Sequence, residues 1–202
     1  MTKIKFCGIF RKEDVEAANQ LHPDFIGFVF AKNSRRSVSI RLASELKAAL
    51  APSIKAVGVF VNENAKTIQM LLDTGVIDMA QLHGNEDENY IAYLRKRTEK
   101  TILQAFRIAG KEDVRKARYS TADYILLDSG AGTGTVFDWR LLKNIQRPYF
   151  LAGGLDCTNV ATAINVLQPF AVDVSSGIET DGKKDRNKMA AFVAAVRKED
   201  GR

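Results

Sequence analysis

Two side chains in this sequence are candidates for proton transfer, and each stands at the end of a short apolar run. Cys7 lies in the run 3–9, and Asp128 closes the run 124–128. A cysteine can accept a proton when its thiolate is favoured, and an aspartic acid can donate one when a closed site raises its pKa. A lone cysteine also packs as a small apolar side chain, and an aspartate after a strand often serves a turn. The two residues can form an acid–base pair only if the fold brings the ends of both runs to the same edge of the protein.

Two later runs end in glycine and serine residues that suit an anion. Glycine lets the backbone approach a ligand closely, and backbone N–H groups with a helix dipole can then hold a phosphate. Glycines also end strands for turn geometry alone, so it is the repetition in two successive loops that favours a phosphate site. The residues predicted here to bind substrate are Gly153, Gly154, Asp173, Ser175, Ser176 and Gly177.

Two further residues could contact a substrate from earlier loops. Arg36 could hold a carboxylate in a two-pronged contact that lysine cannot make, or it could belong to a solvated basic loop. His83 could line the pocket or serve as a hydrogen-bonded loop residue. His22, His83 and Cys157 have no ligand-like spacing, so we expect no metal and no cofactor, and we expect Cys157 to be a packing residue.

Eight strand-like runs could position these groups. Several are continuously apolar, which is typical of strands covered on both faces. The runs are 3–9, 25–30, 55–61, 76–82, 101–108, 124–128, 149–153 and 171–175.

Segments with helical periodicity lie between the runs. They include 40–50 and 111–119, a helix after Asp138, one capped by Thr158 and a last one starting at Asp185. Eight strand–helix units predict an α/β fold, a single eight-stranded parallel (β/α)8 TIM barrel spanning residues 1–202. An open doubly wound sheet would normally carry G-x-G-x-x-G after its first strand, and residues 7–12 do not. In a barrel, the carboxyl ends of all strands meet on one face, which would unite Cys7 and Asp128.

Composition limits the possible settings of the protein. The chain has 202 residues, with 30 Lys and Arg against 24 Asp and Glu, for a formal charge of +6. It contains no apolar run long enough to span a membrane and no leader-like N-terminus, and two distant cysteines favour a reducing cytoplasm. The positive charge is compatible with nucleic acid, a membrane surface or a small phosphorylated molecule.

Stretches along nearly the whole chain resemble one family in order. They are KFCGI at 5–9, FIGFVF at 25–30, SRRSV at 34–38, VGVFVN at 57–62, QLHG at 81–84, LD at 127–128, FDW at 137–139, LAGGL at 151–155 and VDVSSGIE at 172–179. Together they are similar to the phosphoribosylanthranilate isomerases of tryptophan biosynthesis. Arg35, where the family usually has proline, and Phe6, in place of a small or β-branched residue, are departures.

The resemblance implies an Amadori rearrangement of N-(5-phosphoribosyl)anthranilate to the carboxyphenylamino-deoxyribulose phosphate. It implies that Asp128 is the general acid and Cys7 the general base. It also implies that Arg36 holds the anthranilate carboxylate, and that backbone amides near Gly154 and at Ser176–Gly177 hold the phosphate. The glycine-rich segment 130–134 is expected to act as a lid.

Three alternatives remain at this stage. The chain could be a barrel that binds a phosphosugar without catalysis, or a nucleic-acid binder, for which only the charge speaks. It could also be a histidine-pathway relative that works with paired aspartates, against which Cys7 stands at the end of the first strand. We expect a small phosphorylated substrate as partner, no nucleic acid, no membrane, and a monomer or homodimer.

Overall fold

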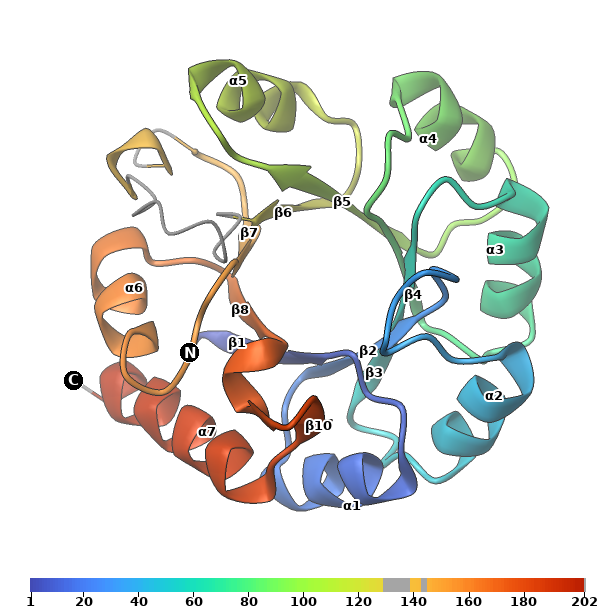
Figure 1. Cartoon of the computed structure of the whole chain (residues 1–202). Coiled ribbons are helices and arrows are strands. Elements are labelled where there is room, and N and C mark those ends of the chain that lie inside the picture. The colour runs from blue at the N-terminus through green and yellow to red at the C-terminus, as the bar shows by residue number, and fades with distance from the viewer. Residues whose placement is uncertain (129–138, 143–144, 202) are drawn as a thin grey trace.

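The strands of this protein close into a barrel. The structure is a computed structural model, and it describes residues 1–128, 139–142 and 145–201. Eight parallel strands follow one another around the barrel in chain order, from β1 to β8 (Figure 1). Closure comes from pairing of β1 with β8, where Lys5 lies opposite Asp173. The predicted (β/α)8 architecture is therefore confirmed.

The strands and helices have the following bounds. The barrel strands are β1 Lys3–Cys7, β2 Phe25–Val29, β3 Lys55–Phe60, β4 Met79–Leu82, β5 Thr101–Arg107, β6 Tyr124–Asp128, β7 Tyr149–Ala152 and β8 Ala171–Val174. The helices are α1 Lys12–Leu21, α2 Ile40–Ala48, α3 Ala65–Asp73, α4 Glu88–Arg95, α5 Lys111–Tyr119, α6 Val160–Leu167 and α7 Arg186–Asp200. Short 3-10 helices cover Trp139–Leu142 and Ser176–Ile178, and β9 Glu179–Thr180 pairs with β10 Lys183–Lys184.

Each predicted strand is present, and three of the helix starts agree with the sequence, including that of α2 at Ile40. Asp185 accepts hydrogen bonds from the first turn of α7, and α5 has the predicted bounds. The cap predicted at Thr158 is wrong, because its hydroxyl donates to Asp156 at 2.6 Å and α6 begins after Asn159. The start predicted at Asp138 lies outside the described residues, and the segment that follows it is a 3-10 helix.

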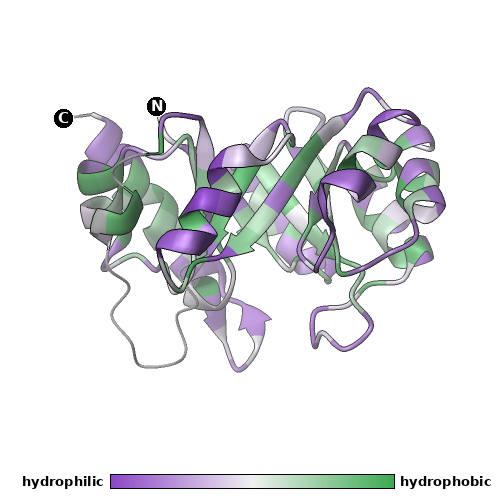
Figure 2. Cartoon of the chain, turned by 90° about the horizontal axis from the view of Figure 1, so that it is seen from above, coloured by the Kyte–Doolittle hydropathy of each residue, from purple (hydrophilic) through white to green (hydrophobic). Residues whose placement is uncertain are grey.

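The barrel buries apolar side chains on both faces of its strands. Helices surround the strands on the outside, and green apolar residues dominate the strands in Figure 2. Inside, the barrel is filled at its amino end by aromatic rings, with Phe25 and Phe150 centred 5.3 Å apart and Tyr124 stacked on Phe170 at 4.9 Å. This apolar layer closes the barrel from below, so a ligand can enter only from the carboxyl ends of the strands.

Aspartates directly before β2, β4 and β6 join neighbouring strands at the amino end. Asp24, Asp78 and Asp123 each accept the backbone N–H of a residue in the preceding strand. Each also pairs with a basic side chain, as Lys3 does with Asp24 at 2.7 Å. Both chain termini lie at one end of the barrel in Figure 2. None of the described helices is both long and apolar enough to cross a membrane.

Candidate active site

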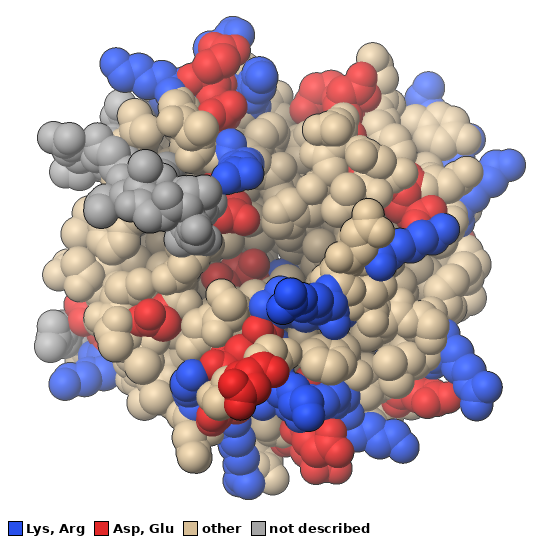
Figure 3. Space-filling view, viewed as in Figure 1, with Lys and Arg blue, Asp and Glu red and all other residues tan. Residues whose placement is uncertain are grey.

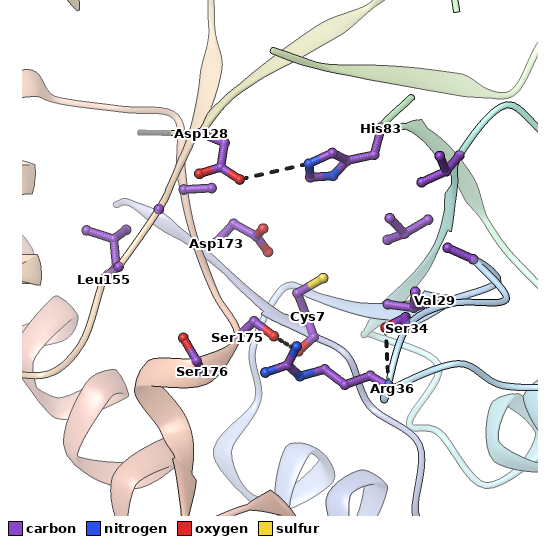
Figure 4. Close-up of a pocket in the computed structure, with 16 residues that line it drawn as sticks. Cys7, Val29, Ser34, Arg36, His83, Asp128, Leu155, Asp173, Ser175 and Ser176 are labelled. Atoms are coloured by element: carbon purple, nitrogen blue, oxygen red, sulfur yellow. Dashed lines mark hydrogen bonds and ion pairs between the residues drawn. The ribbon is translucent and has the colours of Figure 1, made fainter. Parts of the chain in front are cut away.

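A cavity of about 370 Å³ opens at the carboxyl ends of the strands. Figure 4 shows Asp128 and His83 on one side of it, Arg36 and Ser175 on the other, and Cys7 with Asp173 between them. Nine of the ten site residues predicted from the sequence line this cavity: Cys7, Arg36, His83, Asp128, Gly153, Gly154, Asp173, Ser175 and Ser176. Gly177, which directly follows Ser176, does not line it.

Cys7 ends β1 with its thiol at the floor of the cavity. Its carbonyl accepts a hydrogen bond from the Ser175 hydroxyl at 3.1 Å, which ties β1 to the end of β8. Burial raises the pKa of the Cys7 thiol above its ordinary value, and the Lys5 and Lys184 ammonium groups act against that rise. The cysteine therefore rests as a thiol, and any function as a base depends on the cations around it.

Lys5 and Asp173 form an ion pair below the thiol. Nζ of Lys5 lies 2.8 Å from Oδ1 of Asp173, and the lysine side chain is completely buried. Burial acts to lower the pKa of Lys5, but the interactions with Asp173 and Cys7 together outweigh this effect and leave the pKa raised. The lysine is thus a buried positive charge inside the barrel at neutral pH.

Asp128 and His83 face each other across the cavity. Oδ2 of Asp128 lies 3.9 Å from Nε2 of His83, and Nε2 of Gln81 lies 2.9 Å from Nδ1 on the other side of the ring. Burial lowers the pKa of His83 below its ordinary value despite the nearby Asp128 carboxylate, so the ring is neutral at neutral pH. With the Gln81 amide donating to Nδ1, the ring proton sits on Nε2 and points toward Asp128.

The guanidinium of Arg36 is held by Glu179. Nε and Nη2 of Arg36 donate to its two carboxylate oxygens at 2.7 and 2.6 Å. Lys184, whose side chain is fully buried, donates to the same carboxylate at 2.5 Å. The Nε–Nη2 edge of the guanidinium could have bound a substrate carboxylate in a two-pronged contact, but Glu179 of the same protein occupies it. The remaining guanidinium edge carries Nη1.

The loops after β7 and β8 approach each other through glycine. Gly153 and Gly154 have φ angles of 96° and 62°, in the left-handed region that favours glycine. At Gly177 a methyl group would lie 2.0 Å from the carbonyl oxygen of Leu155, so the two backbones can meet only there. This geometry brings the backbones of both loops to the same end of the cavity, as a phosphate site requires.

Other expectations meet different outcomes. Cys157 is exposed, so the packing role predicted for it is wrong. The lid expected at 130–134 lies outside the described residues. Among the residues that the structure describes, no three His, Cys, Asp or Glu side chains cluster as metal ligands would. Basic and acidic side chains are interspersed on the face shown in Figure 3.

Sequence reasoning missed the residues that support the site. Lys5 and Gln81 stand two positions before Cys7 and His83, and the period of two along a strand places each pair on one face. A charged or amide residue inside an apolar strand was thus a usable signal. Glu179 and Lys184 gave no comparable signal, because their partners depend on how the β9–β10 hairpin folds back.

Fold and cavity together define a class: a (β/α)8-barrel protein with a polar cavity at the carboxyl ends of its strands, where barrel enzymes carry their active sites. Comparison with known proteins narrows the class. Residues 4–195 match the family model for N-(5'-phosphoribosyl)anthranilate (PRA) isomerase.

Individual relatives agree with that match. The N-(5'-phosphoribosyl)anthranilate isomerase of Endomicrobium trichonymphae is 43% identical over 98% of this chain and 99% of its own length. A dimeric phosphoribosylanthranilate isomerase from Thermotoga maritima, whose structure was solved as monomers, is 33% identical, with a TM-score of 0.88 over 98% of this chain and 100% of that one. A phosphoribosyl anthranilate isomerase in complex with reduced 1-(o-carboxyphenylamino)-1-deoxyribulose 5-phosphate is 34% identical, with the same TM-score and coverage. The chain belongs to this family, and it is an isomerase of tryptophan biosynthesis.

Proposed function

We propose that this isomerase rearranges N-(5'-phosphoribosyl)anthranilate by general acid–base catalysis, with Asp128 as the acid and Cys7 as the base in one cavity. The observation that carries the proposal is that β1 and β6 end at the same cavity, with Cys7 and Asp128 both lining it. The reaction needs one acid, one base and two anion sites, and the residues around the cavity supply groups for each.

The first step belongs to Asp128. Its carboxylic acid gives a proton to the furanose ring oxygen, the C1–O bond breaks, and the nitrogen lone pair forms a protonated Schiff base. The Nε2–H of His83 faces this carboxylate at 3.9 Å and can stabilise the anion left after the transfer. After Asp128 has given up its proton, its carboxylate therefore still has the neutral His83 ring beside it as a hydrogen donor.

The second step belongs to Cys7. Its thiolate takes the proton from C2, and the C–H electron pair becomes the C1–C2 double bond of the enolamine, which tautomerises to the ketone product. A positioned base or acid is typically worth about 10²–10⁴ in rate. The raised pKa of Cys7 makes the thiolate a minor form that must be favoured by neighbouring cations.

Binding of the two anionic ends is proposed as follows. Arg36 presents Nη1 to the anthranilate carboxylate while Glu179 fixes the rest of its guanidinium. Backbone amides of the loops at Gly153–Gly154 and Ser176–Gly177 hold the phosphate. Asp173 and Ser175 complete the wall between these ends. The support for this assignment is the backbone geometry at the glycines, which leaves room for an oxyanion close to the chain.

Turnover by two variants tests the acid–base assignment. We expect Cys7→Ala and Asp128→Asn each to lose at least about 100-fold in kcat. Both should still bind the reduced product analogue in calorimetry. Cys157→Ala, which removes the other, exposed thiol, is the matched control and should keep full turnover. Near-normal turnover by Cys7→Ala would mean that another group is the base.

The same assay separates catalysis from binding alone, because a phosphosugar-binding barrel would titrate the analogue and form no product. We further propose that residues 1–202 act as one domain in the cytoplasm, with a small phosphorylated substrate and neither nucleic acid nor a membrane as partner. The T. maritima relative is described as dimeric. Sedimentation analysis decides between the monomer and the homodimer expected for this chain.

A further inference from the structure

Lys5 lies directly below Cys7, on the same face of β1. In the register of β1 with β2, Cys7 is paired with Gly27. A methyl group on Gly27 would stand 3.0 Å from the Cys7 sulfur and 3.3 Å from Nζ of Lys5. Both atoms therefore extend over one glycine, in space that any other residue type would fill.

The Lys5 ammonium has donors for both of its neighbours. It carries three N–H groups, and Asp173 accepts one of them at 2.8 Å. The Cys7 sulfur and the same nitrogen both lie over Gly27, and the positive charge of Lys5 acts to lower the pKa of the thiol. Because Asp173 and Cys7 together raise the pKa of Lys5 against the effect of its burial, the sulfur has a positive charge beside it at neutral pH.

Stability alone does not explain an ion pair at this position. Removing two charges from water is costly, and well-packed apolar residues of similar size often stabilise a core at least as well. The amino end of the barrel interior follows that rule, since aromatic rings fill it. The Lys5–Asp173 pair stands instead next to the cavity, which Asp173 lines, and this position indicates a function in the cavity.

Other charged groups lie around Cys7, but each of them has another side chain as its partner. Lys184 from β10 and Arg36 from the loop after β2 both bind Glu179. Across the cavity Asp128 faces His83. Lys5 differs from these cations in lying on the same strand face as the thiol and in sharing contact space with it.

We propose that Lys5 is a positioning residue for the base: its ammonium, held by Asp173 and given room by Gly27, stabilises the thiolate form of Cys7. The inference rests on the proposed role of Cys7. When the thiolate takes the C2 proton, the C–H bond breaks and an S–H bond forms. The sulfur thereby loses its negative charge, while the Lys5–Asp173 pair stays as it is. Lys5 thus sets the fraction of enzyme that is ready to accept a proton and does not itself exchange one.

The test measures the Cys7 thiol directly. In a Cys157→Ser background, the rate of alkylation by iodoacetamide as a function of pH gives the pKa of the remaining thiol. We expect Lys5→Met to raise that pKa by about one to two pH units. The matched control is Lys3→Met, which makes the same change on the same strand and breaks the Lys3–Asp24 pair at the other end of the barrel. It should leave the thiol unchanged.

A double variant keeps the test valid if Lys5→Met folds poorly with Asp173 left unpaired. Lys5→Met with Asp173→Asn removes both buried charges together. Because Lys5 lowers the pKa of Cys7 more than Asp173 raises it, the double variant should show a smaller upward shift than Lys5→Met. A thiol pKa equal to or below that of the parent, in either variant, overturns the inference.

The pH profile of kcat links this result to catalysis. We expect the rise of kcat with pH to move by the same amount as the thiol pKa, so Lys5→Met loses about 10- to 100-fold near neutrality and recovers in alkali, with KM little changed. If the thiol pKa moves but the kcat profile does not, the role of Cys7 as base is wrong. If Cys7→Ala is inactive and the thiol pKa does not move, only the role of Lys5 is wrong.

Discussion

Glu179 can be tested as the group that aims Arg36 into the cavity. Its carboxylate accepts two hydrogen bonds from Arg36 and one from Lys184, at 2.5 to 2.7 Å, and its side chain is only 6% exposed. Glu179→Gln keeps the shape of the side chain and removes the charge. The Gln oxygen can accept at one position, but its NH2 group must then face a cation.

The cost of this substitution follows from the three contacts. A hydrogen bond to a charged group contributes about 1.5–3 kcal/mol, and at least one is lost. Loss of a partner from a fully buried pair costs about 3–5 kcal/mol, and Arg36 is 31% exposed, so we expect a smaller loss of about 2–3 kcal/mol. For a chain of this size, that lowers Tm by about 4–12 °C. KM should rise by about tenfold, the equivalent of 1.4 kcal/mol, while kcat changes much less.

Thermal unfolding as a function of pH gives a second, independent reading. Burial acts to raise the pKa of Glu179, but the hydrogen bonds from Arg36 and Lys184 outweigh it and leave the pKa below its ordinary value. A depressed pKa in the folded state stabilises the fold above the unfolded pKa, about 4.3, and this stabilisation is lost as pH falls through the folded value. The Tm difference between wild type and Glu179→Gln should therefore be constant above about pH 5 and shrink below pH 4.

The control is Glu45→Gln, which breaks the exposed pair of Arg41 with Glu45 on one helix. It should change the free energy of unfolding by less than about 0.5 kcal/mol. A wild-type Tm for Glu179→Gln at pH 7, or a Tm difference that widens in acid, would refute the reasoning. So would a loss confined to kcat, because it would show that Arg36 is not a binding group.

Two glycine substitutions test the space around the cavity. Gly27→Ala places a methyl group 3.0 Å from the Cys7 sulfur and should lower kcat by about tenfold or more, while Gly110→Ala, where the methyl group meets nothing within 4 Å, should leave steady-state kinetics unchanged. Equal kcat for the two variants would contradict the packing argument. Gly177→Ala forces a methyl group to 2.0 Å from the Leu155 carbonyl oxygen, so it should weaken inhibition by inorganic phosphate and lower Tm. An unchanged inhibition constant would place the phosphate elsewhere.

Most of the fold could be predicted because its signals are local. Runs such as Phe25–Val29 are apolar without alternation, which indicates strands buried on both faces, and the spacing between runs leaves room for one helix each. The errors fall at turns. Thr158 has the residue type of a helix cap, but its hydroxyl donates a hydrogen bond to the Asp156 carboxylate, which also accepts the backbone N–H of Asn159. The helix therefore starts one residue later than expected.

The groups that line the cavity could be predicted, and their partners could not. Strand ends are readable from sequence, and the barrel rule then places Cys7 and Asp128 on one rim. The partner of Arg36 lies 143 positions away on a hairpin, and nothing in the local sequence specifies that contact. For this reason the sequence predicted a two-pronged contact between Arg36 and the substrate and did not predict that Glu179 already binds two of its nitrogens.

The strand register supports the proposal that Cys7 is the base. A closed barrel stacks side chains in layers, and the period of two along β1 assigns Lys5 and Cys7 to successive layers on one axis. Pairing of β1 with β8 adds Asp173 beside Lys5, and pairing with β2 adds Gly27 beside Cys7. Burial shields the reaction from water, but burial by itself would keep the thiol protonated and so would hinder proton removal by the thiolate. In the proposed mechanism, a lysine one layer below reduces that conflict without occupying the cavity, and its own charge is matched by the Asp173 carboxylate on the neighbouring strand.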